Sequence, residues 1–241
     1  MITSVKILEG FEATQNVGYG KREGYHLDAF EIGHVLDTNS NLVVLIGDNG
    51  SGKTTFLRKL HSQEHNSFWE RHLKDSSALL KSPYFEISHS NEKNQPPIWY
   101  SEEKQPLDGD SIESQIRLRG GRDNTKNDHL KTYSSGQYSI YQLDTLFREL
   151  KRKSHMTYLF DQPEDGISMF RRQALVDAFS NCAFGGGVQI FVATHEPRFL
   201  NVEGAKIINL EDKPAQSYEG GKFDITRYMK PMESLSQGLF P

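Results

Sequence analysis

Residues 42–55 read Leu-Val-Val-Leu-Ile-Gly-Asp-Asn-Gly-Ser-Gly-Lys-Thr-Thr, and this stretch decides the fold class. Leu42–Ile46 is a continuous aliphatic run, the pattern of a strand that is buried on both faces in a parallel sheet. The run leads directly into a glycine-rich turn, after which a helix is expected to about Leu60. The stretch therefore predicts a strand, a loop and a helix, the repeating unit of an α/β protein.

The turn matches the phosphate-binding pattern G-x-x-x-x-G-K-[ST] from Gly47 to Thr54, between the strand and the helix that the pattern requires. Glycines let backbone N–H groups converge on phosphate oxygens, and the helix N-terminus adds partial positive charge. A plain glycine-rich turn is the alternative, but such a match seldom arises by chance. We predict that Lys53 reaches the β- and γ-phosphates of a nucleotide and that the Thr54 hydroxyl ligates Mg²⁺. The predicted nucleotide-binding residues are Asn49, Gly50, Ser51, Gly52, Lys53, Thr54 and Thr55.

Three further motifs follow the loop in order. Tyr133–Gln137 reads Tyr-Ser-Ser-Gly-Gln and opens a segment of helical period, Tyr158–Glu164 is an apolar strand that ends at Asp161, and Val192–Pro197 is a strand that ends at His195. Each motif alone is unremarkable, and a Ser/Gly pentapeptide is an ordinary helix cap. The phosphate loop, the Ser-Gly-Gln helix start, strand–Asp and strand–His in this order resemble the ATP-binding cassette (ABC) ATPases.

This resemblance implies ATP and Mg²⁺ as cofactors and gives each motif a role. Asp161 is expected to hold Mg²⁺ with Thr54, because a carboxylate at the C-terminal end of a strand faces the phosphate loop in an open α/β sheet. His195 is expected to donate a hydrogen bond to the γ-phosphate. The signature residues are expected to contact the γ-phosphate of ATP bound to a second chain. They are Ser134, Ser135, Gly136 and Gln137.

The chain departs from the family directly after Asp161, where Gln162 stands in place of the usual glutamate. An amide can orient an attacking water but cannot accept its proton as a carboxylate does, so we expect slow ATP hydrolysis. The alternative is that Glu164, or the phosphate itself, takes the proton and turnover is ordinary. A natural Asp-Gln-Pro-Glu sequence and an engineered Glu→Gln substitution look the same here.

The other family motifs are weaker. Gln95 and Gln105 are equal candidates for the glutamine that senses the γ-phosphate and Mg²⁺. A third possibility is that neither residue has this role. The segment aligned with the usual Ala-Leu-Asp after the acidic strand is Gly166-Ile167-Ser168, which puts the contacts of this loop across a dimer in doubt.

The chain as a whole predicts one ABC-type ATPase domain over residues 1–241. We expect an α/β fold whose mostly parallel core sheet is flanked by helices, with an N-terminal antiparallel β portion and a small inserted subdomain at about 62–132. Outside the motifs, the expected strands are Val5–Leu8, Ala29–Ile32, Ile98–Ser101, Met156–Phe160, Val188–Thr194 and Lys206–Leu210, the expected helices are Ser139–Lys153 and Met169–Phe179, and Asn16–Tyr25 is expected to be a loop.

Composition narrows the class of protein. The formal net charge of −4 argues against a protein that coats DNA by bulk electrostatics. One cysteine, Cys182, excludes a disulfide framework and a cysteine-built zinc site. The apolar runs are far shorter than a membrane span, so we expect a cytoplasmic protein without a membrane role of its own.

The branch of the family decides the expected function. Transporter cassettes continue after their signature with a basic, alanine-rich helix, and Tyr138–Leu146 does not match it. Asp-Gln-Pro-Glu-Asp and the Gly10-Phe11 pair look more like the RecF-like, SMC-like and anti-phage ATPases. We therefore expect an ATP-gated dimeric switch, a homodimer or heterodimer, that controls an effector protein such as a nuclease or toxin, or a nucleic-acid transaction in DNA repair or anti-phage defence. The alternative is the ATP-binding subunit of an ABC transporter.

Arginines offer the one hint of a further ligand. Arg117, Arg119 and Arg122 lie in a glycine-containing segment shortly before the signature, and Arg171-Arg172 opens an expected helix. A solvated charged face is the plain reading. The alternative is a contact with a nucleic-acid backbone, an opposing nucleotide or an acidic effector.

Overall fold

A computed structural model of the chain describes residues 1–9, 12–17, 21–73, 84–90, 97–101, 147–148, 156–165, 167–224 and 226. The strands are β1 (Ile2–Ile7), β2 (Glu12–Val17), β3 (Lys21–His26), β4 (Val35–Asp37), β5 (Leu42–Ile46), β6 (Phe85–His89), β7 (Ile98–Ser101), β8 (Thr157–Asp161), β9 (Gln189–Ala193), β10 (Lys206–Asn209) and β11 (Gln216–Glu219). The helices are α1 (Lys53–Leu73), α4 (Arg172–Gly186) and the 3₁₀ helices η2 (Met169–Arg171) and η3 (Pro197–Asn201).

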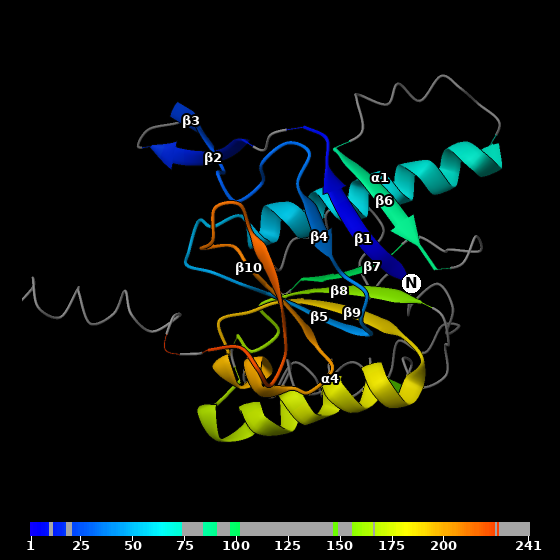
Figure 1. Ribbon diagram of the computed structural model, residues 1–241, viewed down its shortest axis with the longest axis vertical. Coiled ribbons are helices and arrows are strands. Elements are labelled where there is room, and N and C mark those ends of the chain that lie inside the picture. Colours follow the sequence, from blue (N-terminus) through cyan, green and yellow to red (C-terminus); the bar gives the residue numbers. More distant parts are fainter. Residues whose placement is uncertain are drawn as a thin grey trace, which may run out of the picture.

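A six-stranded sheet in the order β11-β10-β5-β9-β8-β7 forms the centre of the molecule (Figure 1). Its strands are parallel apart from β11, which pairs antiparallel with β10. Asp161 at the end of β8 lies opposite Ala193 at the end of β9, so these strands finish at one edge of the sheet. The predicted α/β class with a mostly parallel core sheet is confirmed.

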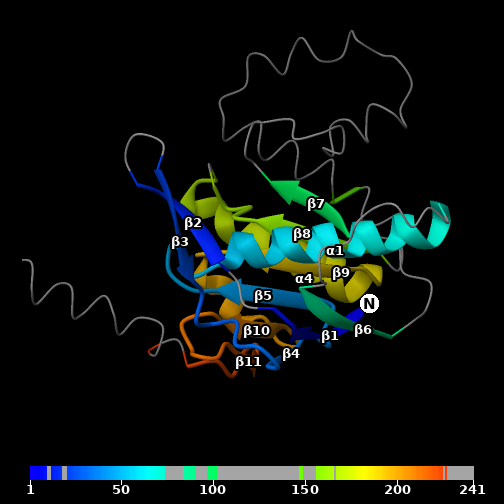
Figure 2. The same ribbon diagram turned by 90° about the horizontal axis from the view of Figure 1, so that it is seen from above.

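The buried strand predicted at Leu42–Ile46 is β5, and all five of its residues are buried. Leu42, Val44 and Ile46 face one apolar cluster, whereas Val43 and Leu45 face a second one. The first cluster lies under α4, where Phe179 packs edge-to-face on Phe160 with ring centroids 4.7 Å apart. The second lies under α1, which runs across β8 and β9 (Figure 2). A strand covered by a helix on each face needs apolar residues at every position, which explains the uninterrupted run.

An antiparallel sheet, β4-β1-β6, lies beside α1 and confirms the predicted N-terminal antiparallel portion. Polar side chains attach it to the rest of the fold. The buried Gln189 side chain accepts a hydrogen bond from Ile2 N–H (2.7 Å) and donates to Ile2 O (2.7 Å), which joins β9 to β1. Gln63 of α1 pairs in the same two-way manner with the backbone of Phe85 in β6, at 2.6 and 2.9 Å.

Two expectations for the N-terminal region were wrong. The loop expected at Asn16–Tyr25 contains parts of an antiparallel pair, β2 with β3. Ala29–Ile32, expected as a strand, forms turns in which Phe30 N–H donates to Leu27 O at 3.0 Å. The turn directs the Phe30 ring onto Phe56 of α1, with centroids 5.7 Å apart, so Phe30 is apolar because it covers the helix and not because it belongs to a strand.

The region predicted as an inserted subdomain at 62–132 begins within the main architecture. α1 continues to Leu73, beyond the expected end near Leu60; β6 pairs with β1, and β7 forms an edge of the central sheet, as expected for Ile98–Ser101. Residues 102–132 lie outside the described residues, so an insertion there stays a prediction.

The second half of the chain follows the expected order. The strands near Met156–Phe160, Val188–Thr194 and Lys206–Leu210 are β8, β9 and β10 within two residues at either end. The helix expected at Met169–Phe179 begins as η2 and continues as α4 to Gly186, where Gly187 (φ 65°) closes it in the left-handed conformation. Of the helix expected at Ser139–Lys153, the structure describes residues 147–148, which are helical. Within the described chain, none of the helices has the length and apolar character needed to cross a membrane.

Candidate functional site

The phosphate-binding pattern forms the connection between β5 and α1. Two of its glycines are required by space as well as by backbone conformation. A Cβ at Gly47 (φ 147°) would lie 2.5 Å from Ser51 Oγ, and a Cβ at Gly52 (φ 102°) would lie 2.8 Å from the side chains of Leu27 and Phe30. The loop therefore has its shape because side chains are missing at these positions.

Lys53, the first residue of α1, is 5% exposed. Its Nζ donates to Gly47 O at 2.6 Å and to Asp48 O at 2.9 Å, so the ammonium group lies within the curve of the loop. Burial lowers the pKa of Lys53, while the nearby carboxylates of Asp161 and Glu211 act in the opposite direction. A buried ammonium enclosed by a loop is a strong attractor for an anionic group.

Thr54 and Asp161 meet next to this lysine. Thr54 Oγ1 donates to Asp161 Oδ1 at 3.1 Å, which joins the first turn of α1 to the end of β8. A hydroxyl and a carboxylate placed together supply the oxygen ligands that Mg²⁺ prefers. The two residues predicted from separate motifs to hold this ion are thus brought into contact.

A cavity of about 100 Å³ lies at the loop. It is lined by Asn49, Gly50, Gly52, Lys53, Thr54, Thr55 and Gln162. Gln162 has a left-handed backbone (φ 49°) that costs on the order of 1 kcal/mol for a side chain of this kind, and its N–H donates to Ala193 O at 2.8 Å. This conformation turns the chain sharply after β8 and places Gln162 beside the phosphate loop.

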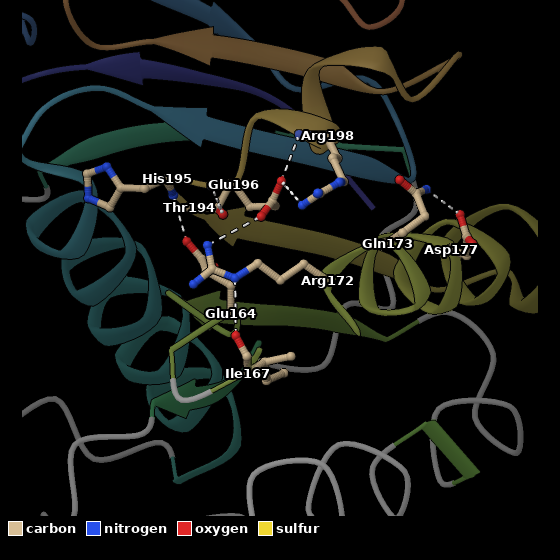
Figure 3. A network of polar contacts seen from close by, with 9 residues as sticks. All are labelled: Glu164, Ile167, Arg172, Gln173, Asp177, Thr194, His195, Glu196 and Arg198. Atoms are coloured by element: carbon tan, nitrogen blue, oxygen red, sulfur yellow. Dashed lines mark hydrogen bonds and ion pairs between the residues drawn. The ribbon is translucent and has the colours of Figure 1, made fainter. Parts of the chain in front are cut away.

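Glu164 and His195 come together from the ends of β8 and β9. His195 N–H donates to Glu164 Oε1 at 2.7 Å, and Glu164 is 3% exposed (Figure 3). Burial raises the pKa of Glu164, although the hydrogen bond from His195 acts against this. Burial and the positive charge of Lys53 lower the pKa of His195, so the imidazole is neutral at physiological pH and can act as a donor through one nitrogen.

Buried polar atoms without partners test whether the site fits a phosphate group. Ser51 Oγ, His195 Nε2 and Glu164 Oε2 are buried and have no hydrogen-bond partner among the described residues. Such atoms are costly to leave unpaired, and two of the three can donate to a phosphate oxygen. Ser51 Oγ and His195 Nε2 as donors, Lys53 as a cation and the Thr54–Asp161 pair as oxygen ligands together fit Mg·ATP.

Several predicted site residues lie outside the described residues: Ser134, Ser135, Gly136, Gln137, Gln95, Gln105 and Gly166. Their roles stay predictions.

Two acidic residues near the site were not predicted from the sequence. Glu211, which follows β10, accepts a hydrogen bond from Asp48 N–H at 2.5 Å and so holds the start of the phosphate loop. Glu196 is buried between Arg172 and Arg198, with Nη1 atoms at 3.4 and 2.8 Å. Glu211 follows a strand that neighbours β5, the same signal that singled out Asp161, but nothing in the sequence marks the partners of Glu196.

One known protein family matches the chain. Its description is "AAA domain, putative AbiEii toxin, Type IV TA system", and it matches residues 65–201, more than half of the sequence. The chain belongs to this family. Among curated proteins, none matches.

Solved structures place the fold among ABC ATPase domains. The ATP-binding cassette MJ0796, in a dimeric post-hydrolysis state bound to ADP and Pi, is 15% identical with a TM-score of 0.52, over 92% of this chain and 100% of the other. MJ1267, an ATP-binding cassette of an ABC transporter in its ADP conformation, is 13% identical with a TM-score of 0.54, over 98% of both chains. For cbiO1 from Clostridium perfringens, part of the ABC transporter complex cbiONQ, the values are 14% and 0.50, over 99% and 96%. Identities this low show the fold alone. The resemblance to ABC-type P-loop ATPases inferred from four motifs is confirmed.

Proposed function

We propose that this ABC-type ATPase binds Mg·ATP at the phosphate loop and hydrolyses it slowly. One observation carries the proposal. Two parts of the chain, the start of α1 and the end of β8, converge on one cavity: Lys53, Thr54 and Gln162 line it, and Asp161 accepts a hydrogen bond from Thr54. Each has the chemistry that a step of nucleotide binding or hydrolysis requires.

The roles follow from the side chains. Lys53 and the backbone N–H groups of the loop bind the phosphates, and Thr54 and Asp161 would hold Mg²⁺, which neutralises phosphate charge. His195 reports the γ-phosphate. Gln162 orients water through its amide but accepts no proton, while one oxygen of Glu164 is engaged by the His195 backbone, and both features support slow turnover.

We further propose that two subunits close around two ATP molecules and act as a switch. The signature residues Ser134, Ser135, Gly136 and Gln137 would complete the site of the partner subunit. The family description names a toxin of a toxin–antitoxin system, which supports control of an effector such as a nuclease or toxin, or of nucleic acid, over a housekeeping role.

A transporter subunit is the second candidate, because cbiO1 and MJ1267, which share the fold, belong to ABC transporters. Such likeness concerns the fold, and the sequence after Gln137 lacks the basic, alanine-rich helix of those cassettes. The switch is therefore the better-supported function.

ATP-driven association tests the proposal. Light scattering at micromolar protein should report a dimer with Mg·ATP and a monomer with Mg·ADP, since a ligand that binds only the dimer favours it by mass action. Lys53→Ala is the control and should stay monomeric in both. A wild-type mass that no nucleotide changes contradicts the switch, and recovery of the chain only with a membrane fraction favours the transporter candidate.

A further inference from the structure

Two buried glutamates, Glu164 and Glu196, accept hydrogen bonds from the backbone at and just after His195. On one side, Glu164 Oε1 accepts the His195 N–H at 2.7 Å. On the other, the next residue, Glu196, has a side chain that is 1% exposed. The main chain that carries the imidazole is therefore fixed from both directions (Figure 3).

The Glu196 carboxylate joins three segments. Its Oε1 accepts from Arg198 Nη1 at 2.8 Å and from Arg198 N–H at 3.2 Å, and the side chain thereby caps η3. Its Oε2 accepts from Arg172 Nη1 at 3.4 Å, and Arg172 Nε in turn donates to Ile167 O at 3.2 Å. The contacts connect the loop after β9, the start of α4 and the segment after β8.

Thr194 completes the restraint. Its side-chain oxygen accepts the Glu196 N–H at 2.9 Å, and the residue itself is fully buried. A buried carboxylate needs such partners, because an unpaired one would be strongly destabilising. Figure 3 shows the His195 ring pointing away from Glu196 and Arg198, so these two residues hold the backbone of the loop and do not contact the imidazole.

We propose that Glu196, held by Arg172 and Arg198, is a positioning residue that fixes the His195 side chain toward the phosphate loop. The inference rests on the proposed function of that site. It goes beyond stabilising the fold: a network that merely stabilised would leave His195 equally effective once the protein had folded. Catalysis depends on placement, and a shift of about 1 Å costs on the order of a hundredfold in rate.

The test substitutes Glu196→Gln, with Asp177→Asn as the matched control. Asp177 accepts a hydrogen bond from Gln173 on the exposed part of α4, the helix that carries Arg172, so Asp177→Asn removes a carboxylate charge in the same way without touching the loop after β9. We expect E196Q to lower kcat for ATP about ten- to a hundredfold with KM changed less than about threefold, because phosphate binding by the loop is retained. The control should behave as wild type.

A double variant distinguishes a positioning role of Glu196 from a purely stabilising one, because only a residue that acts through His195 has no further effect on kcat once His195 is removed. If Glu196 acts through His195, the kcat of the E196Q, H195A double variant should equal that of H195A. Multiplied effects would overturn the proposal. Arg198→Gln, which loosens a half-exposed partner, provides the same comparison should E196Q fail to fold.

An NMR titration of the His195 imidazole, assigned by its loss in H195A, needs no turnover. In the wild type its pKa is lowered by burial and by Lys53, and raised by Asp165 and Asp48. Release of the loop would expose the ring and raise the pKa toward its ordinary value, whereas simple loss of the Glu196 charge would lower it. A pKa that is unchanged or lower in E196Q overturns the inference, even if the wild type hydrolyses no ATP and the proposed function itself fails.

Discussion

At the scale of single residues, the site contrasts an amide and a carboxylate that follow β8. Gln162 lines the phosphate-loop cavity in a strained backbone conformation, whereas Glu164 is buried with one oxygen on the His195 N–H. A water molecule in the cavity would therefore contact the Gln162 amide. One oxygen of the nearby Glu164 carboxylate is already engaged by the His195 N–H. We therefore expect residue 162 to control the rate of ATP hydrolysis and residue 164 to control how protein stability depends on pH.

Gln162→Glu should raise ATP turnover by roughly ten- to a thousandfold, the range attributed to a positioned base or water-orienting group. The left-handed backbone is retained, since both residues have the same shape. Steady-state phosphate release measures the effect, and Lys53→Ala in the same background controls for contaminating activity. A glutamate variant no faster than wild type would show that residue 162 does not act on the water.

Glu164→Gln should stabilise the protein more at pH 8 than at pH 5. The pKa of Glu164 is raised by burial, so the folded state keeps its proton to a higher pH than the unfolded state, and the wild type loses stability as pH rises above the ordinary value. Glutamine keeps the acceptor for His195 N–H and carries no charge. Urea unfolding of both proteins should give a difference on the order of 1 kcal/mol between the two pH values.

Glu211→Gln is the comparison for this change, because Glu211 also accepts a backbone N–H but is exposed. Its change removes an exposed carboxylate near the loop and keeps the acceptor for the backbone N–H, so it controls for the loss of charge alone. An equal effect in the two variants would mean that burial of Glu164 does not cause the difference.

At the scale of elements, the site depends on how the phosphate loop packs against the turn at Leu27–Phe30. The two side chains of this turn lie where a Cβ of Gly52 would go, and Phe30 stacks on Phe56 of α1. Residues 27–30 therefore pack against the phosphate loop and also cover the start of α1. A substitution in the phosphate loop should therefore lower both the stability of the protein and its affinity for nucleotide.

Gly52→Ala should destabilise the protein by about 1–3 kcal/mol and weaken ATP binding, because it adds a clash to an unfavourable backbone conformation. Gly33→Ala isolates the backbone part, since Gly33 (φ 86°) has nothing within 4 Å of its Cβ position. Urea unfolding and titration with a fluorescent ATP analogue measure the two effects. Equal losses in both variants would show that the contacts with Leu27 and Phe30 are unimportant.

At the scale of the whole molecule, parallel strands bring their functional ends to one edge of the central sheet. The Thr54–Asp161 contact and the Glu164–His195 hydrogen bond both lie where β5, β8 and β9 end. A site at one edge can be completed by a second copy, as proposed, and leaves other surfaces for an effector or nucleic acid.

Substitution of three arginines, Arg117, Arg119 and Arg122, tests whether the protein binds nucleic acid. If this cluster contacts phosphates, the triple-alanine variant should bind labelled duplex or single-stranded DNA more weakly with ATP present, and each lost contact should reduce the log–log salt slope by about 0.9 on duplex DNA. The three arginines lie outside the described residues, and Lys213→Ala with Lys222→Ala, two exposed lysines within them, is the control. Equal binding by all three proteins would leave the cluster as a solvated charged face.

The sequence by itself determined the strands of the central sheet, except β11, and the core of the site. Local patterns suffice where chemistry and neighbours along the chain coincide: the apolar run Leu42–Ile46 requires burial on both faces, the glycines before Lys53 permit a tight loop, and an acid after a strand lies at the sheet edge. Thr54 and Asp161, 3.1 Å apart, could therefore be paired in advance.

Only the tertiary structure decided which polar residues hold the parts together. Gln63 and Gln189 look like ordinary surface glutamines in sequence, yet they join α1 and β9 to the antiparallel sheet. Phe30 resembles a strand residue but packs from a turn, and Glu196 pairs not only with its near neighbour Arg198 but also with Arg172, which comes from another segment. Each of these roles depends on partners distant along the chain, and a hydrogen bond or an ion pair leaves no periodic signal in the sequence from which those partners could be predicted.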